Sequence, residues 1–350
     1  MAIPDTFKAY RRTAGEPPLT ITQTTETTPK TLGPKDVLVK VRSVSLNYRD
    51  VAMLHGQYPI SIIDKGIPGS DAATEVVAVG SDVNKFRVGD HVSPNFFLNY
   101  LTGEETGGRQ ALGGDVDGVL GEYAVFKEDV LVKLPEYLSW DEAATIPCAG
   151  VTAWTSLDGL KKLTPGKSYV LLEGTGGVSM FALILLVDAG INTIITSSSD
   201  AKIAQLEKLS PLIKGVNYKT HGDVSAEVQR ITAGRGVDVV INNSGIGNIP
   251  SNIESAGTHG DIAIVGFLGG WEADWSPSEL LKLIFKAASL RGIGVGTRLD
   301  FENLNAYLAE RKIGLKTLVD KVFAFDEAKE GFDYMYAGRH VGKIIVKVAE

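Results

Sequence analysis

The chain has 350 residues, a formal net charge of −7 and a pI near 5.4, which argue against nucleic acid or an anionic membrane as its main partner. Its single cysteine, Cys148, excludes an intrachain disulfide and a four-cysteine zinc site. No apolar run approaches the roughly 20 residues of a membrane helix, and the first residues lack the apolar core of a signal peptide, so we expect a cytosolic protein.

The N-terminal part of the chain has the pattern of a β-rich region. Residues 37–44 alternate, with Val37, Val39 and Val41 on one side, which predicts a half-buried strand. Residues 73–79 and 123–126 also predict strands, and Gly, Pro and Asp separate these segments.

Residues 99–118 interrupt this pattern with six glycines and four acidic residues. Such a composition is not that of a packed element. Two interpretations stay open: a solvated excursion, or a lid or subunit-contact loop.

The pattern changes after residue 140. Residues 140–146 and 153–163 predict helices, and strands and helices then alternate. The predicted strands are residues 169–173, 193–197, 216–218, 237–242, 261–267 and 290–295, and two of the helices between them are residues 178–188 and 200–208. This alternation predicts an α/β fold with a doubly wound parallel sheet. The tail predicts one more helix at 303–311 and a closing strand at 343–348.

A glycine-rich turn follows the first strand of this alternating region, at residues 173–179. Glycines let backbone N–H groups approach a pyrophosphate at the N-terminus of the next helix. Ser179 replaces the third glycine of the usual motif, but the strand before, the helix after and the next strand favour a dinucleotide site over an ordinary tight turn. The candidate cofactor-binding residues are Gly174, Thr175, Gly176, Gly177 and Val178.

The end of the second strand favours NADP(H) over NAD(H). It reads Thr-Ser-Ser-Ser at residues 196–199, without the acid that binds ribose hydroxyls in NAD sites. Hydroxyl groups can donate to a 2′-phosphate that a carboxylate would repel. Asp200 is the objection, and we expect it to cap the next helix instead. The candidate phosphate-binding residues are Ser197, Ser198, Lys202 and Tyr218.

Motifs spread over nearly the whole chain resemble the medium-chain dehydrogenase/reductase superfamily. They lie at residues 67–71 (Ile-Pro-Gly-Ser-Asp), 79–81, 88–90, 143–148, 152–154, 166 onward and 342–343. The closest likeness is to the zinc-free alcohol-dehydrogenase-like and quinone-oxidoreductase-like branches. The resemblance implies a GroES-like catalytic domain at 1–149 and 293–350, with a Rossmann domain inserted at 150–292. It also implies an active site in the cleft between the domains, and a homodimer joined near residues 290–295.

The same alignment argues against catalytic zinc. Zinc members hold the metal with two cysteines and a histidine, and these positions fall here at Asn47, Ser70 and Cys148. One thiol with an amide and a hydroxyl would bind zinc poorly, so we expect no metal. Cys148 is then expected to be a small buried apolar residue.

Hydrogen-bond donors must replace the metal. Tyr48 is the predicted proton donor, with a packing aromatic beside the cofactor as the alternative. Asn47 is predicted to hold the substrate oxygen, or else to orient the nicotinamide or cap a turn. The resemblance implies further cofactor contacts by Thr152, Asn242, Ser244, Gly266, Phe267, Leu268 and Lys343.

These features predict a reductase that uses NADPH on quinones, enones or reactive carbonyls, because hydrogen bonds hold charge best on such soft acceptors. The alternatives are a zinc-free alcohol dehydrogenase or ketone reductase, or an NADPH-binding protein with little turnover. The substrate is expected to be an apolar small molecule, since aromatic residues are predicted near the site. These residues are Tyr48, Tyr58, Phe96, Phe97, Phe267 and Trp271.

Overall fold

A computed structural model describes residues 3–349. They divide into two compact units: residues up to Val151 together with those from Gly296 onward, and Thr152–Val295. No helix within residues 3–349 is long and apolar enough to cross a bilayer.

The first unit is built on a seven-stranded sheet. Its strand order is β14-β15-β3-β4-β5-β7, and β6 pairs with β3. The strands are β3 (Asp36–Leu46), β4 (Asp71–Val79), β5 (His91–Pro94), β6 (Tyr123–Lys127), β7 (Leu131–Lys133), β14 (Val319–Ala324) and β15 (Lys343–Lys347). The three N-terminal strands predicted at 37–44, 73–79 and 123–126 are confirmed as β3, β4 and β6.

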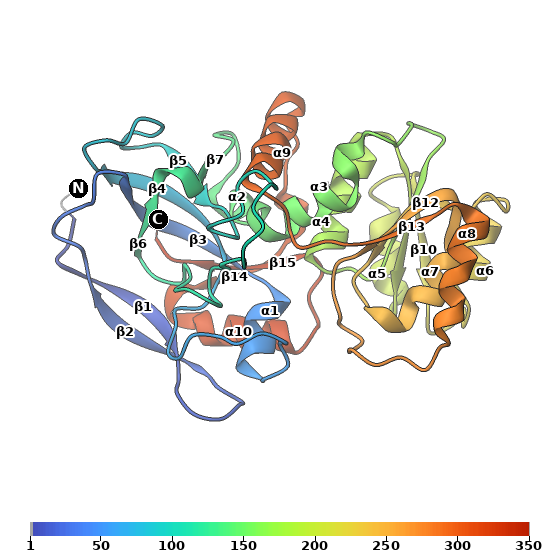
Figure 1. The fold of residues 1–350 in the computed structure, drawn as a ribbon, viewed down its shortest axis with the longest axis horizontal. Helices are drawn as coiled ribbons and strands as arrows, with labels where there is room; N and C mark the ends of the chain where they lie inside the picture. Colours follow the sequence, from blue (N-terminus) through green and yellow to red (C-terminus); the bar gives the residue numbers. More distant parts are fainter. Residues whose placement is uncertain (1–2, 350) are drawn as a thin grey trace. The chain divides into compact units, whose positions relative to one another are not determined.

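β3 lies between β15 and β4, so the chain's C-terminal strand adjoins an N-terminal one, as the red and blue arrows show (Figure 1). The prediction that β3 is half buried is wrong, since Leu38, Ser43 and Ser45 are buried as well as the valines. The reason is its central place: α2 (Trp140–Ala143) and α10 (Ala328–Tyr336) contact it, and residues of the N-terminal hairpin share its hydrophobic cluster.

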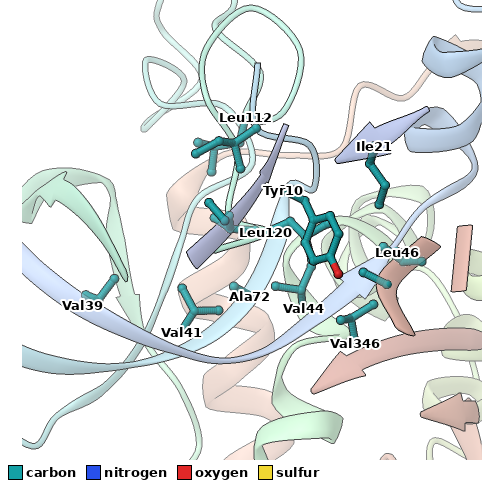
Figure 2. Close-up of a cluster of buried hydrophobic side chains, with 14 of the residues drawn as sticks. Tyr10, Ile21, Val39, Val41, Val44, Leu46, Ala72, Leu112, Leu120 and Val346 are labelled. Atoms are coloured by element: carbon teal, nitrogen blue, oxygen red, sulfur yellow. The ribbon is translucent and has the colours of Figure 1, made fainter. Parts of the chain in front are cut away.

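A two-stranded antiparallel hairpin, β1 (Thr6–Arg12) and β2 (Ile21–Thr27), packs on this sheet. Figure 2 shows the side chains of Tyr10 and Ile21 in one cluster with Val44, Leu46 and Val346. Burial of such side chains is the main stabilising contribution to the unit.

Four α-helices complete the first unit. They are α1 (Tyr48–Leu54), α2 (Trp140–Ala143), α9 (Arg298–Arg311) and α10 (Ala328–Tyr336). The helix predicted at 140–146 is shorter, because a π-helical turn, Ile146–Gly150, follows α2. The helix predicted at 303–311 begins five residues earlier, because Thr297 caps it and the Asp300 carboxylate completes the capping box.

The glycine-rich excursion at residues 99–118 is only partly solvated. Residues 103–110 are exposed, but Ala111–Gly114 are buried. Two buried arginines hold this part: Arg49 Nη1 donates to Leu112 O at 2.8 Å, and Arg12 Nη1 donates to Gly113 O at 2.8 Å. The expectation that the whole stretch is unpacked is therefore wrong, because glycine's lack of a side chain lets it pass close to its neighbours.

The second unit contains a six-stranded parallel sheet of order β10-β9-β8-β11-β12-β13. Its strands are β8 (Tyr169–Leu172), β9 (Asn192–Ser197), β10 (Ile213–Asn217), β11 (Val237–Asn242), β12 (Ala256–Ile264) and β13 (Ser289–Gly292). In order of sequence this is 3-2-1-4-5-6, the Rossmann order. The predicted doubly wound parallel sheet is confirmed.

Helices connect these strands. They are α3 (Val151–Ser156), α4 (Gly177–Asp188), α5 (Asp200–Glu207), α6 (Val224–Ile231), α7 (Ile249–Ser255) and α8 (Lys282–Lys286). Because parallel crossovers are right-handed, the reversal of direction at β8 places α4 and α5 on one face and α6 and α7 on the other. The helix predicted at 153–163 ends at Ser156, because residues 158–160 have positive φ.

Candidate functional site

The candidate catalytic residues of the first unit lie where β3 ends and α1 begins. Asn47 is extended (φ −123°, ψ 152°) and caps α1, and its N–H donates to the Asp50 carboxylate at 2.8 Å. Asp50 is fully buried, so desolvation raises its pKa, while the nearby Arg49 guanidinium opposes that rise. This cap fixes the backbone from which Asn47 and Tyr48 project.

Asn47, Ser70 and Asp71 form a chain of hydrogen bonds. Asn47 Nδ2 donates to Ser70 Oγ at 3.2 Å, and Ser70 Oγ donates to Asp71 Oδ1 at 2.7 Å. The other carboxylate oxygen of Asp71 accepts the Cys148 N–H at 3.1 Å. The fold therefore brings together the three positions aligned with zinc ligands: Asn47 bonds Ser70 directly, and Asp71 joins Ser70 to the backbone of Cys148.

Lys343 lies inside the first unit and is 2% exposed. Its Nζ donates to Leu46 O at 2.7 Å and to Asn47 Oδ1 at 2.5 Å, and it lies 3.8 Å from Asp71 Oδ2. An ammonium has three donors, so these contacts use most of its capacity. With its oxygen held by Lys343, the Asn47 amide must turn its nitrogen toward Ser70. This geometry favours a positioning role for Lys343 over direct contact with a cofactor.

Gly342 allows the chain to deliver Lys343 to this place. Its φ is +86°, and a Cβ would overlap the carbonyl oxygen of Leu318. Any other residue would suffer both the left-handed strain and the clash. Gly342 therefore lets the backbone turn directly into β15.

The donor set does not fit zinc. The Asn47 oxygen is bound by an ammonium, and the Ser70 hydroxyl is bound to a carboxylate. Desolvation and the Asp71 carboxylate raise the pKa of the Cys148 thiol to about 12, whereas zinc binds thiolate. Within residues 3–349, no group of three or more His, Cys, Asp or Glu side chains could hold a metal ion.

Tyr48 begins α1, and its side chain is 39% exposed. The residue next to it, Asn47, is partly exposed, whereas Arg49 and Asp50 are buried. At the start of α1, Tyr48 and Asn47 are thus the side chains that a small molecule can reach from the surface of this unit.

In the second unit, the glycine-rich turn joins β8 to α4. Thr175 precedes Gly176, which caps α4, and Gly177 and Val178 begin the helix. Gly174 has φ +72°, and a Cβ on Gly174 or Gly176 would meet no atom within 4 Å. The open outer side of the turn and the unpaired N–H groups at the start of α4 fit the diphosphate of a dinucleotide.

Ser179 explains how the third glycine of the motif can be absent. Its side chain is fully buried, and its Oγ donates to Glu173 O at 2.8 Å and accepts Asn243 Nδ2 at 2.9 Å. The hydroxyl thereby ties α4 to β8 and β11, where a glycine would allow only close packing.

Glu173, the residue after β8, was not predicted to have a role. Its carboxylate is almost completely buried and accepts Ser244 N–H at 3.2 Å, Asn248 Nδ2 at 3.1 Å and Asn252 Nδ2 at 2.7 Å. It therefore links the glycine-rich turn to the segment that follows β11. The signal in the sequence was an acidic residue directly after an apolar strand.

The residues expected on the ribose and carboxamide side occupy the ends of β11 and β12. Asn242 is fully buried, and its side chain bonds Gly245 and Asn252, so it supports the loop that carries the partly exposed Ser244. The N–H groups of Gly266 and Leu268 donate to Asn242 O and Asn243 O. The Phe267 carbonyl accepts the Gly270 N–H at 2.9 Å, so backbone bonds hold this segment in place.

Thr152 begins the second unit and is 3% exposed. Its carbonyl accepts hydrogen bonds from Thr155 Oγ1 at 3.1 Å and Ser156 Oγ at 2.7 Å. These bonds fix the backbone at the position where the resemblance expects the nicotinamide.

The candidate 2′-phosphate residues come from the ends of two paired strands. β9 ends at Ser197, which is in register with Asn217 at the end of β10, and Tyr218 N–H donates to Ser197 O at 3.1 Å. Ser198 is exposed, Tyr218 is 47% exposed, and Lys202 lies in the first turn of α5. These side chains therefore share one end of the sheet.

The prediction that Asp200 caps α5 is wrong. Ser199 is the cap, and its hydroxyl accepts Lys202 N–H at 3.4 Å. Asp200 is the first residue of the helix, and its carboxylate accepts Asn217 Nδ2 at 2.7 Å. The serine hydroxyl takes the cap because it lies one residue nearer the strand.

Comparison with known proteins decides the family. Residues 33–136 match the model "Alcohol dehydrogenase GroES-like domain", and residues 177–310 match "Zinc-binding dehydrogenase". A zinc-type alcohol dehydrogenase-like protein of Schizosaccharomyces pombe is 39% identical over 325 residues, which cover 91% of this chain and 93% of that protein. The chain belongs to the medium-chain dehydrogenase/reductase superfamily.

Two solved structures agree with this assignment. A candidate alcohol dehydrogenase from Sinorhizobium meliloti 1021 has a TM-score of 0.90 and 30% identity, covering 99% of this chain and 100% of that one. An NAD-dependent alcohol dehydrogenase has a TM-score of 0.83 and 27% identity, covering 98% and 100%. The chain is thus an oxidoreductase of the medium-chain dehydrogenase/reductase type, with GroES-like and Rossmann-like domains and a site for a nicotinamide cofactor.

Proposed function

We propose that this chain is an NADPH-dependent reductase of quinones, enones or reactive carbonyls that works without catalytic zinc. The observation that carries the proposal is the hydrogen-bonded group of Asn47, Ser70, Asp71 and Lys343. It includes Asn47 and Ser70, two of the three positions aligned with zinc ligands, and offers hydrogen-bond donors where a zinc enzyme has a Lewis acid.

The preference for NADPH rests on the strand ends of the second unit. The exposed Ser198 supplies a hydroxyl there, Lys202 supplies a positive charge, and Tyr218 extends from the neighbouring strand end. The Ser197 hydroxyl is buried beside them and accepts the Ser199 N–H at 3.2 Å. The nearest acid, Asp200, is engaged by the Asn217 amide. Solved structures of this fold include an NAD-dependent alcohol dehydrogenase and a crotonyl-CoA carboxylase/reductase in complex with NADP, so the argument rests on the charge at this end of the sheet.

Side chains of the first unit would handle the substrate oxygen. When bound, a reduced nicotinamide would supply a hydride to a substrate carbon, and negative charge would gather on the substrate oxygen. Asn47 Nδ2 has two N–H groups, of which Ser70 takes one, so the other can donate to that oxygen. The Tyr48 phenol would supply the proton. Such donors suit an enolate or hydroquinone oxygen better than the alkoxide of a simple alcohol.

The decisive experiment measures NADPH and NADH oxidation with a panel of enones, quinones and aldehydes. We expect turnover with at least a tenfold preference for NADPH in kcat/KM, which is about 1.4 kcal/mol. Tight NADPH binding without turnover would support the alternative of a binding protein. Reduction of NADP⁺ or NAD⁺ by simple alcohols, with no NADPH oxidation by the panel, would support the zinc-free alcohol dehydrogenase.

The proton donor is tested with Tyr48→Phe. We expect kcat to fall about 100-fold, the lower end of the usual contribution of a general acid. Tyr336→Phe, a similarly exposed tyrosine of the same unit, serves as the matched control. An unchanged kcat in Tyr48→Phe would remove that residue from the role, and stoichiometric zinc retained through chelation would overturn the metal-free mechanism.

We also propose a homodimer formed along β13, an edge strand of the parallel sheet. The neighbouring α8 exposes Ile284 at 71% and Phe285 at 87%, and such side chains are typical of contact surfaces. Light scattering should give a dimer for the natural chain and a monomer for Phe285→Asp. Leu209→Asp, at a comparably exposed leucine, is the control.

A further inference from the structure

The first unit contains a pocket of about 310 Å³ that the proposed reaction does not use. It is formed by the segment after β1, the last turn of α1 and residues 58–65. Its apolar wall consists of Leu19, Met53, Tyr58, Ile60, Ile62 and Ile63. The charged side chains of Asp64 and Lys65, of opposite sign, also line it.

One wall of this pocket carries a buried guanidinium. Arg12 is 2% exposed, and its Nη1 donates to Gly113 O. Its Nε and Nη2 are buried without a hydrogen-bond partner. A Cβ on Gly66 would lie 2.6 Å from both Arg12 Nη2 and Ile63 Cγ1, so the unpaired nitrogen lies close to the apolar wall of the pocket.

The charges around Arg12 favour an anion. Its charged neighbours are Asp50, Arg49 and Asp117, and the Arg49 Nε and Nη2 also lack partners. Asp117 is paired with Arg11 at 3.2 Å, which leaves Arg12 and Arg49 with the fully buried Asp50. An unpaired buried donor is destabilising, and a carboxylate can accept two N–H groups from one guanidinium.

We propose that this pocket binds a short aliphatic acid, with the carboxylate on Arg12 and the tail on the apolar wall. A volume near 300 Å³ lies at the lower end for small-molecule sites. Met53, which lines the pocket, is five residues after Tyr48, which is about 8 Å along α1. None of Asn47, Tyr48 and Lys343 lines the pocket, and its occupation can be measured without turnover.

Calorimetric titration of the full chain with hexanoate and with hexanol tests the proposal. We expect hexanoate to bind at least tenfold more tightly, because hexanol shares the tail but lacks the charge. Equal affinity for the two, or no binding of hexanoate, would overturn the proposal.

Two variants locate the binding. Arg12→Met is expected to abolish the preference for hexanoate, whereas Arg12→Lys keeps a charge and should retain part of it. Arg12 also donates to the Gly113 carbonyl. If the Arg12 variants do not fold for that reason, Ile60→Trp is the variant that tests the pocket. Ile60 is 44% exposed, so tryptophan there should narrow the pocket and weaken hexanoate at least tenfold without lowering Tm. A folded variant of either kind that binds hexanoate like the natural chain would refute the site.

The carboxylate could belong to the reduced substrate or to a separate molecule. If hexanoate competes with an uncharged enone in NADPH oxidation, the pocket accepts the tail of the substrate. If hexanoate leaves the enone's KM unchanged, the acid is a separate ligand. Both results are consistent with binding of the acid in the pocket. If the chain does not turn over any substrate, the proposed function is refuted, but the calorimetric test of the pocket still stands.

Discussion

Replacing Lys343 by methionine tests the candidate catalytic site most directly. Methionine keeps much of the side-chain volume but removes the ammonium that contacts Leu46 O, Asn47 Oδ1 and Asp71 Oδ2. The Asp71 carboxylate, which is fully buried, would then lose its cation. Lys347→Met, at an exposed position of the same strand, is the control.

The expected loss of stability follows from these contacts. Removing one partner of a buried ion pair costs about 3–5 kcal/mol. Two hydrogen bonds from a charged donor, at about 1.5–3 kcal/mol each, give a similar figure. Adding Asp71→Asn to Lys343→Met should recover part of the loss, because the variant then has no unpaired buried charge.

The loss should depend on pH. Desolvation raises the pKa of Asp71 in the folded chain, so its stabilising contribution is present at low pH and is lost as the pH rises through the folded pKa. Without Lys343, which opposes that rise, the pKa goes higher. The free energy of unfolding that Lys343→Met loses relative to the natural chain should therefore be larger at pH 8 than at pH 5.

Urea unfolding at the two pH values measures this loss of stability. Steady-state kinetics tests whether Lys343 positions the catalytic residues or contacts the cofactor. A positioning residue predicts a fall in kcat with the KM for NADPH unchanged within about twofold. A KM that rises tenfold or more would show direct cofactor contact instead. A deficit below about 1 kcal/mol, or strictly additive effects of Lys343→Met and Asp71→Asn, would refute the reasoning.

Three further changes have defined outcomes. Glu173→Gln replaces an accepting oxygen by a donor, so we expect the free energy of unfolding to fall by about 1–3 kcal/mol. Calorimetry should also show several-fold weaker NADPH binding. An unchanged NADPH affinity would disprove the link between Glu173 and the glycine-rich turn. The Cys148 thiol, with a pKa of about 12, should be roughly one part in 10⁴ thiolate at pH 8, so rapid alkylation of the folded chain would contradict the described site. The Lys35 ammonium and the backbone N–H of Asn84 lower the pKa of Glu128 to about 2. Its contribution is therefore present above pH 4.5 and is lost as the pH falls toward 2, and unfolding measured at pH 3 and 6 should show a weaker acid dependence in Glu128→Gln.

The spacing of apolar residues predicted those helices and strands in which one periodicity is clear. The alternating strands and helices after residue 169 gave the parallel sheet, and apolar alternation gave β3, β4 and β6. α1 was missed because it has only seven residues, although Asn47 and Asp50 stand at capping-box spacing. α10 was also missed, since it has only nine residues and contains a glycine, which weakens the helical signal.

Burial was predicted less well, because it depends on neighbours that are distant in sequence. β3 alternates, yet both faces are covered. The glycine-rich excursion is polar in composition, yet Arg12 and Arg49, remote in sequence, hold its middle part inside the first unit.

The sequence by itself determined the residue types at each chemical position. The glycines after β8, the serines after β9 and the absence of zinc ligands at Asn47 and Ser70 are all local facts. Only the tertiary structure decided which groups meet. Lys343 reaches Asn47 because β15 pairs with β3 across nearly 300 residues, and Glu173 meets Asn252 because β8 lies beside β11. Such contacts depend on strand pairing, and the order of strands in a sheet is not written in the spacing of residues along the chain.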